Sequence, residues 1–145
     1  MRAARFASVA TLAWLLAISL TVVPKAQAPT SDEDFDKLMK SVGQTVGSMR
    51  KNMEGQMGSA VAADAKKMAD LQKNNAAFWS ARKADDAVEW ATSAMNHAME
   101  IDKAVAANNM ASAAEHMKMM MGTCGQCHMK YRDKAADGTY MIKKQ

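Results

Sequence analysis

The 145-residue chain predicts an all-α protein, an antiparallel up-down-up-down four-helix bundle. Three observations lead to this fold class. Four segments carry apolar residues every three or four positions, as amphipathic helices do. The breaks between them are short, which favours antiparallel neighbours. Helix-forming Ala, Met, Lys, Glu and Gln dominate, and no stretch is predicted to form a strand.

The N-terminus, residues 1–28, has the three zones of an export signal. Arg2 and Arg5 make a basic start, an apolar run covers 6–23, and Ala26-Gln27-Ala28 offers small residues for cleavage. We therefore expect a signal peptide at 1–28 and periplasmic localisation.

An uncleaved membrane anchor is the alternative for this segment. The apolar run has 18 residues, near the lower limit of about 20 for a membrane-spanning helix. Pro29 would follow the cut, and peptidases dislike proline there. With cleavage, no stable membrane span is expected in the mature chain.

The mature chain, 29–145, is long enough for one small domain with one core. Cleavage removes three of the 19 basic residues and none of the 15 acidic ones, which leaves a net charge of only +1. This balance gives no reason to expect nucleic-acid binding.

The first helix is expected over about 32–57, and the second over about 59–77. Thr30 and Glu33 can form a capping box before the first helix. The apolar positions of the first helix are Phe35, Leu38, Met39, Val42, Val46, Met49 and Met53. Those of the second are Ala62, Ala65, Met68, Ala69 and Leu71.

The third helix is expected over about 85–107, where "ANN" at 107–109 ends it, and the fourth over about 110–136, where Asp137-Gly138 ends it. One face of the third carries Val88, Ala91, Met95, Ala98, Ile101 and Val105. One face of the fourth carries Ala113, Met117, Met120, Met121, Cys124, Cys127, His128 and Tyr131. A core of alanine and flexible methionine is thin, and a large apolar cofactor would add buried area to it.

The only two cysteines lie in a C-x-x-C-H motif formed by Cys124, Cys127 and His128. This is the attachment signature of c-type haem. Positions i and i+3 share one face of a helix, so both thiols can add to the vinyl groups along one porphyrin edge. His128 then presents its imidazole to the iron as the proximal ligand. The motif predicts one covalently bound haem c.

Two other kinds of site use the same residues. A dithiol redox pair usually sits in a βαβ setting, which this chain does not predict. A zinc site would need a further ligand, and His116 is the only helper on the same helix. A haem-free dithiol or metal-binding helical module is therefore the alternative.

The motif on the last helix, followed by "MKYR", resembles the cytochrome c-prime family of class II c-type cytochromes. "LMKSVGQTVGSM" at 38–49 is similar to that family's Met-Lys-x-apolar-Gly-x-x-x-Gly stretch. The resemblance implies a four-helix bundle with haem fixed near the C-terminus, and self-association through the first helix would give a homodimer. In one departure, Phe35 stands where the family often has an arginine that contacts a haem propionate. The candidates to replace it are Lys37, Lys40, Arg82 and Lys83.

The distal iron ligand is predicted to be Met39. In an up-down-up-down bundle, His128 would lie eight residues before Ala136, about 12 Å from one pole, and Met39 seven residues after Asp32, about 10 Å from the same pole. The two would be level, and the family resemblance points to the same position. Alternatively, Met39 only packs over an open iron face that binds nitric oxide or carbon monoxide.

The remaining histidines and aromatic residues receive structural roles. His97 and His116 are too far along their helices to reach the iron and are expected to be solvated or capping groups. Phe78, Trp79 and Trp90 are expected at the haem end, as a wall of the porphyrin or as core.

Together these observations predict a periplasmic cytochrome, not an enzyme, that carries single electrons to and from redox partner proteins through one haem. The alternative on the same scaffold is a five-coordinate haem protein that binds nitric oxide or carbon monoxide.

Overall fold

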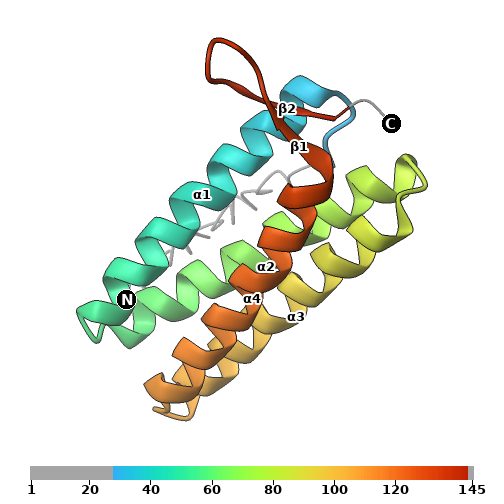
Figure 1. Ribbon diagram of the computed structural model, residues 1–145. Helices are drawn as coiled ribbons and strands as arrows, with labels where there is room; N and C mark the ends of the chain where they lie inside the picture. The colour runs from blue at the N-terminus through green and yellow to red at the C-terminus, as the bar shows by residue number, and fades with distance from the viewer. Residues whose placement is uncertain (1–27, 144–145) are drawn as a thin grey trace, which may run out of the picture.

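The computed structural model describes residues 28–143, so the predicted signal peptide, apart from Ala28, lies outside the described residues. The described part contains four helices, α1 (Asp32–Glu54), α2 (Gly58–Ala81), α3 (Asp85–Ala106) and α4 (Met110–Tyr131). A hairpin of β1 (Arg132–Lys134) and β2 (Tyr140–Ile142) follows them. The predicted all-α four-helix bundle is confirmed, and Figure 1 shows the chain reversing direction at each helix connection.

The helix ends follow local chemistry. Ser31 Oγ accepts a hydrogen bond from the Asp34 backbone N–H at 3.1 Å, so Ser31, rather than a box made by Thr30, caps α1. The side chain of Asn109 caps α4 in the same way through the N–H of Ser112. Helix α2 runs four residues further than the sequence predicts, which places Phe78 and Trp79 inside its last turn.

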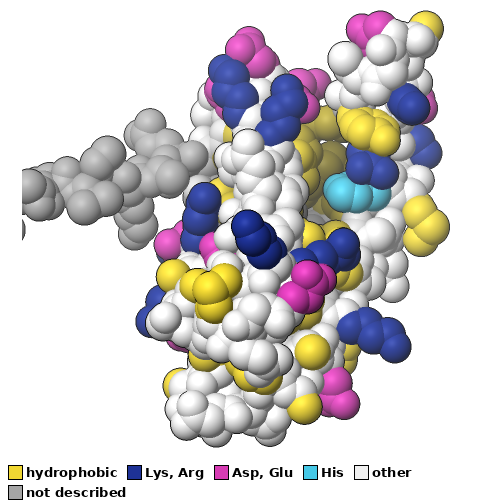
Figure 2. Space-filling view, turned by 90° about the vertical axis from the view of Figure 1, so that its left-hand side faces the viewer, with side chains coloured by type: hydrophobic (Ala, Val, Ile, Leu, Met, Phe, Trp, Pro, Cys, Tyr) yellow, Lys and Arg dark blue, Asp and Glu magenta, His cyan; other side chains and the backbone are white. Residues whose placement is uncertain are grey.

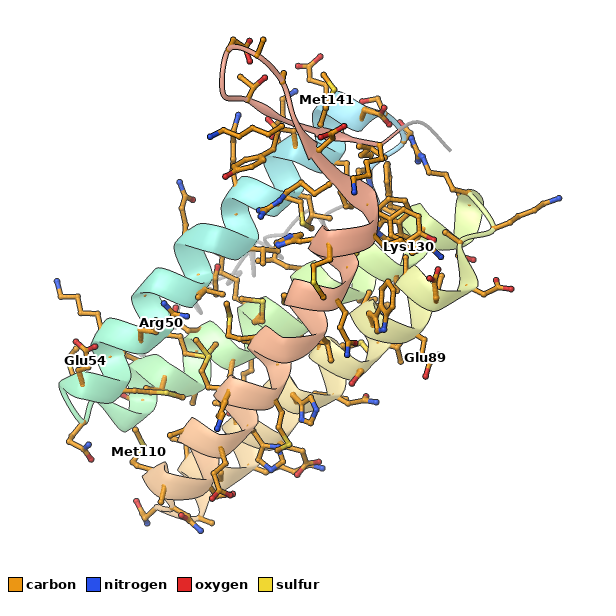
Figure 3. The ribbon with its side chains drawn as sticks, in the orientation of Figure 1. Arg50, Glu54, Glu89, Met110, Lys130 and Met141 are labelled. Carbon is orange, nitrogen blue, oxygen red and sulfur yellow. The ribbon has the colours of Figure 1, made fainter. Side chains whose placement is uncertain are left out.

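The helices do not pack equally around the bundle. The extensive helix–helix contacts join α1 with α2, α2 with α3, and α3 with α4, whereas α1 and α4 are not such a pair. Figure 1 shows α1 standing apart from α4, with the hairpin crossing from the end of α4 to the start of α1. Strand β2 contacts α1 there, and Met141 lies over the first turns of α1 (Figure 3). We call the boundary between α1 and α4 the open seam.

The buried side chains form two clusters. The methionine–alanine core fills the middle of the bundle with Val42, Met49, Val61, Ala65, Met68, Ala94, Ala98, Ile101, Ala104, Ala113, Met117 and Met120. The aromatic cluster lies at the hairpin end and consists of Phe35, Leu38, Phe78, Trp79, Ala87 and Tyr131. Phe35 stacks on Phe78 with ring centroids 4.0 Å apart, and Trp79 lies 4.5 Å from Tyr131. The two clusters provide a firm aromatic end and a middle made of small or flexible side chains.

The C-terminal segment differs from the prediction, which extended the fourth helix to Ala136 and expected no strand. The helix ends at Tyr131, and Arg132 is already extended at φ −102° and ψ 131°. Asp137-Gly138 forms the hairpin turn instead of a helix end, with Gly138 at φ 87°, a backbone conformation that glycine adopts without strain. Because the hairpin folds back, Ile142 packs against the aromatic cluster, which contains Tyr131.

Candidate functional site

The C-x-x-C-H motif lies in the last two turns of α4, beside the open seam. Cys124 is half-buried and packs against the methionine–alanine core, whereas Cys127, one turn further, packs against the aromatic cluster. Both thiols are free. They therefore face the apolar interior at the boundary between the two clusters.

Both thiols are held in the protonated form. Burial raises the pKa of Cys124, and burial, helped by the neighbouring charges of Cys124 and Asp86, raises the pKa of Cys127 to about 11. A redox-active dithiol has a lowered pKa, because the thiolate is the attacking species. The electrostatics of this pair therefore give no support to the dithiol alternative.

His128 borders a surface cleft of about 480 Å³. The cleft is lined by Gly125, His128, Met129, Arg132, Asp133, Lys134 and Tyr140. Figure 2 shows the molecule hollowed on this side, with hydrophobic side chains inside the hollow and a histidine and basic side chains at its rim. Burial, and then the charge of Arg132, lowers the pKa of His128. The imidazole is thus kept neutral, the form that binds a metal ion.

Met39 is half-buried on α1 and packs against both the methionine–alanine core and the aromatic cluster. The sequence-based prediction that Met39 and His128 lie level assumed a fourth helix that reaches Ala136, and that assumption was wrong. Because α4 ends at Tyr131, His128 lies three residues, about 4.5 Å, from the helix end, so equal heights do not follow from counting. Met39 is related to the motif through shared neighbours, since Cys124 packs against the methionine–alanine core and Cys127 against the aromatic cluster, and Met39 packs against both.

Helices α1 and α4, which border the open seam, both carry partly buried apolar side chains that pack against the methionine–alanine core. They include Met39, Val46 and Met53 on α1 and Met121 and Cys124 on α4. A Cβ atom added at Gly43, Gly47, Gly122 or Gly125 would meet no other atom within 4 Å, and all four glycines are exposed. The apolar side chains suit a porphyrin, and the glycines leave the backbone of both helices accessible from solvent.

Trp79 supplies a second observation on fit. Its indole N–H is buried and has no hydrogen-bond acceptor within residues 28–143. An unsatisfied buried donor costs about 1–3 kcal/mol, which an acceptor on a bound group would recover. Phe78 is fully buried and Trp90 is partly buried near Tyr131, so both belong to the aromatic packing as predicted for core residues.

Asp86 joins the start of α3 to the end of α4, a contact that was not predicted from the sequence. Its carboxylate accepts a hydrogen bond from Tyr131 Oη at 2.6 Å and lies 2.5 Å from Lys130 Nζ. Figure 3 shows Lys130 on α4. These two donors, Lys130 first, hold the pKa of Asp86 below its ordinary value. Lys130 and Tyr131 lie two and three residues after His128, so this contact fixes the last turn of α4, which also carries the end of the motif.

Three of the four predicted propionate partners are already engaged. The ion pairs are Lys37 with Glu33 at 2.8 Å, Lys40 with Asp36 at 2.6 Å, and Arg82 with Asp32 at 2.6 Å. The hairpin instead brings Arg132 and Lys134 to the cleft beside His128. Sequence reasoning missed Lys134 because it extended the fourth helix to Ala136, whereas the helix ends at Tyr131 and Lys134 lies in the extended strand β1.

The prediction that His97 and His116 are solvated or capping groups was wrong. They face each other from α3 and α4, with their Nδ1 atoms 3.2 Å apart and both residues half-buried.

Comparisons with models of known families, with curated proteins and with solved structures found no match for this chain. Within the described residues, no helix is both long enough and apolar enough to cross a membrane. The same residues contain no group of three or more His, Cys, Asp and Glu side chains arranged to hold a metal ion.

Proposed function

We propose that this chain is a periplasmic mono-haem c-type cytochrome, similar to the cytochrome c-prime family, that carries single electrons between redox partner proteins. The observation that carries the proposal is the position of the C-x-x-C-H motif. Its two thiols pack against the two apolar clusters, Met39 packs against the same clusters from α1, and α1 and α4 make few contacts with each other.

Each residue of the site has one task in this proposal. Cys124 and Cys127 hold the cofactor through thioethers, and their i, i+3 spacing keeps both sulfur atoms on one face of α4. His128, kept neutral by burial, is the proximal ligand, and Met39 is the distal ligand. The haem iron supplies a one-electron couple between its ferrous and ferric states.

The surrounding chain would favour electron transfer in two ways. The methionine–alanine core and the aromatic cluster would give the haem apolar neighbours, and the Asp86 contacts hold the last turn of α4 in place. A rigid, dry site limits reorganisation when the charge of the iron changes by one.

A five-coordinate protein that binds nitric oxide or carbon monoxide is the second candidate. It is favoured by the packing of Met39, whose side chain is already engaged with both the methionine–alanine core and the aromatic cluster. In that case Met39 packs over the iron without binding it.

A haem stain after denaturing electrophoresis tests the attachment, because only a covalent adduct survives. The chain matured in a bacterial host that attaches haem should stain, and Cys124→Ser combined with Cys127→Ser should not. A matured wild-type chain with the mass of the bare polypeptide and two intact thiols would refute the proposal and leave the haem-free module.

Optical spectra then separate the two haem functions. A Met39 ligand gives a reduced spectrum that carbon monoxide does not change, whereas Met39→Ala should become responsive to carbon monoxide. Met53→Ala is the matched control, because Met53 is a partly buried methionine on the same side of α1, four turns away. Equal responses of wild type and Met39→Ala would remove Met39 from the iron and favour gas binding.

A further inference from the structure

His97 and His116 lie outside the proposed haem site and take no part in it. Antiparallel packing of α3 on α4 brings the two rings together, with centroids 5.5 Å apart and a 40° angle between the ring planes. His116 precedes His128 by twelve residues, which is about 18 Å along α4. Any ligand of this pair would therefore be separate from the haem.

We infer that His97 and His116 form a binding site for a divalent transition-metal ion, with Cu²⁺ preferred over Zn²⁺. The Nδ1 atoms are 3.2 Å apart. Two imidazole nitrogens that are each about 2.0–2.1 Å from one metal ion and 3.2 Å from each other subtend about 100° at that ion. This angle lies between those of square-planar and tetrahedral coordination, so small ring rotations are sufficient to direct both lone pairs to one ion.

The charges around the pair are compatible with a cation. Glu100 lies one turn after His97 on α3, and its pKa is lowered first by Lys103, with which it pairs at 2.6 Å, and further by His116 and His97. Glu100 is thus a nearby negative charge on the same helix, and it is paired with Lys103. Neither helix needs to move, because both rings are already half-buried side by side.

The donor set also decides which ions bind and how strongly. Imidazole nitrogen suits copper, nickel and zinc, and affinity for Cu²⁺ exceeds that for Zn²⁺ at a given site. Because the described residues contain no third His, Cys, Asp or Glu already arranged with the pair, water completes the coordination. Binding should therefore be reversible and weaker than at a four-ligand structural zinc site.

Calorimetric titration of the mature haem-loaded chain with Zn²⁺ and, separately, Cu²⁺ tests the site. We expect one ion per chain, with tighter binding of Cu²⁺. His97→Gln and His116→Gln, which keep a polar side chain at the contact, should each weaken binding by at least about tenfold. Asn96→Ala, at an exposed neighbour of His97, is the matched control and should bind as wild type.

Thermal unfolding gives a second readout that does not depend on heats of binding. Added Zn²⁺ should raise the melting temperature of wild type and of Asn96→Ala, but not that of either glutamine variant. No saturable binding, or equal binding by wild type and both glutamine variants, would overturn the inference.

Discussion

The half-buried Cys127 thiol should react slowly in the folded, haem-free chain. The perturbation is a change of pH, applied to residues 29–145 produced without export so that no haem is attached. Burial is the largest cause of the raised pKa of Cys127, about 11, and the charges of Cys124 and Asp86 add to it. An unperturbed thiol has a pKa of about 8.5.

The size of the effect follows from the thiolate fraction. At pH 8 about one Cys127 in a thousand is ionised, compared with about one in four for an unperturbed thiol. The more basic thiolate is the better nucleophile, which offsets roughly tenfold of this difference. The net expectation is alkylation about 20-fold slower than in the unfolded chain, before any loss of access through burial.

Iodoacetamide labelling followed by peptide mass spectrometry measures the rate at Cys127, with the same chain in urea as the reference and circular dichroism as the check on folding. The rate in the folded chain should continue to rise up to about pH 11. A folded chain that is alkylated as fast as the unfolded one, or whose rate levels off near pH 8.5 or below, would refute the reasoning. It would also favour the dithiol alternative.

Three further predictions concern stability. Met120→Ala should cost about 2–5 kcal/mol in urea unfolding because Met120 is 0% exposed, whereas Met119→Ala, at 44% exposure, should change stability by no more than about 0.5 kcal/mol. Asp86→Asn should lower the unfolding midpoint. It should also remove a contribution that wild type has above the unfolded aspartate pKa of about 3.9 and loses as pH falls through the lower folded pKa. The haem-free chain should lose stability as pH falls below about 6.5, because the folded state lowers the pKa of His128 and opposes its protonation, and His128→Gln should reduce this loss.

Each of these has an outcome that contradicts it. Equal costs for Met119→Ala and Met120→Ala would mean that the α4 face is wrongly assigned. If the stability of Asp86→Asn falls with decreasing pH in the same way as that of wild type, the Asp86 contacts do not stabilise the end of α4. An identical slope between pH 7 and pH 5 for wild type and His128→Gln would show that the imidazole is as free to take a proton in the folded chain as in the unfolded one.

The four helices were predictable because their signals are local. Phe35, Val42 and Met49 recur at the helical period, and all three are buried in α1. The C-x-x-C-H motif was equally visible, because three nearby residues of α4 carry it. The cap at Ser31 and the end of α2 were less predictable, since neighbouring residues compete closely for such positions.

Contacts between residues far apart in the sequence could not be predicted from local patterns. The extended backbone of Arg132 ends α4 and starts the hairpin. The spacing of apolar residues along the chain does not predict this change. The contacts of Asp86 with Lys130 and Tyr131 join positions more than forty residues apart, and the two histidines are nineteen apart.

The sequence by itself determined the helical segments, the apolar face of each and the C-x-x-C-H motif, because these depend on spacings of three or four residues along one helix. Only the tertiary structure decided that α1 and α4 make few contacts with each other, that Lys134 in β1 lines the cleft beside His128, and that His97 meets His116. The physical reason is that a helix exposes its side chains in every direction, and only packing decides which faces meet.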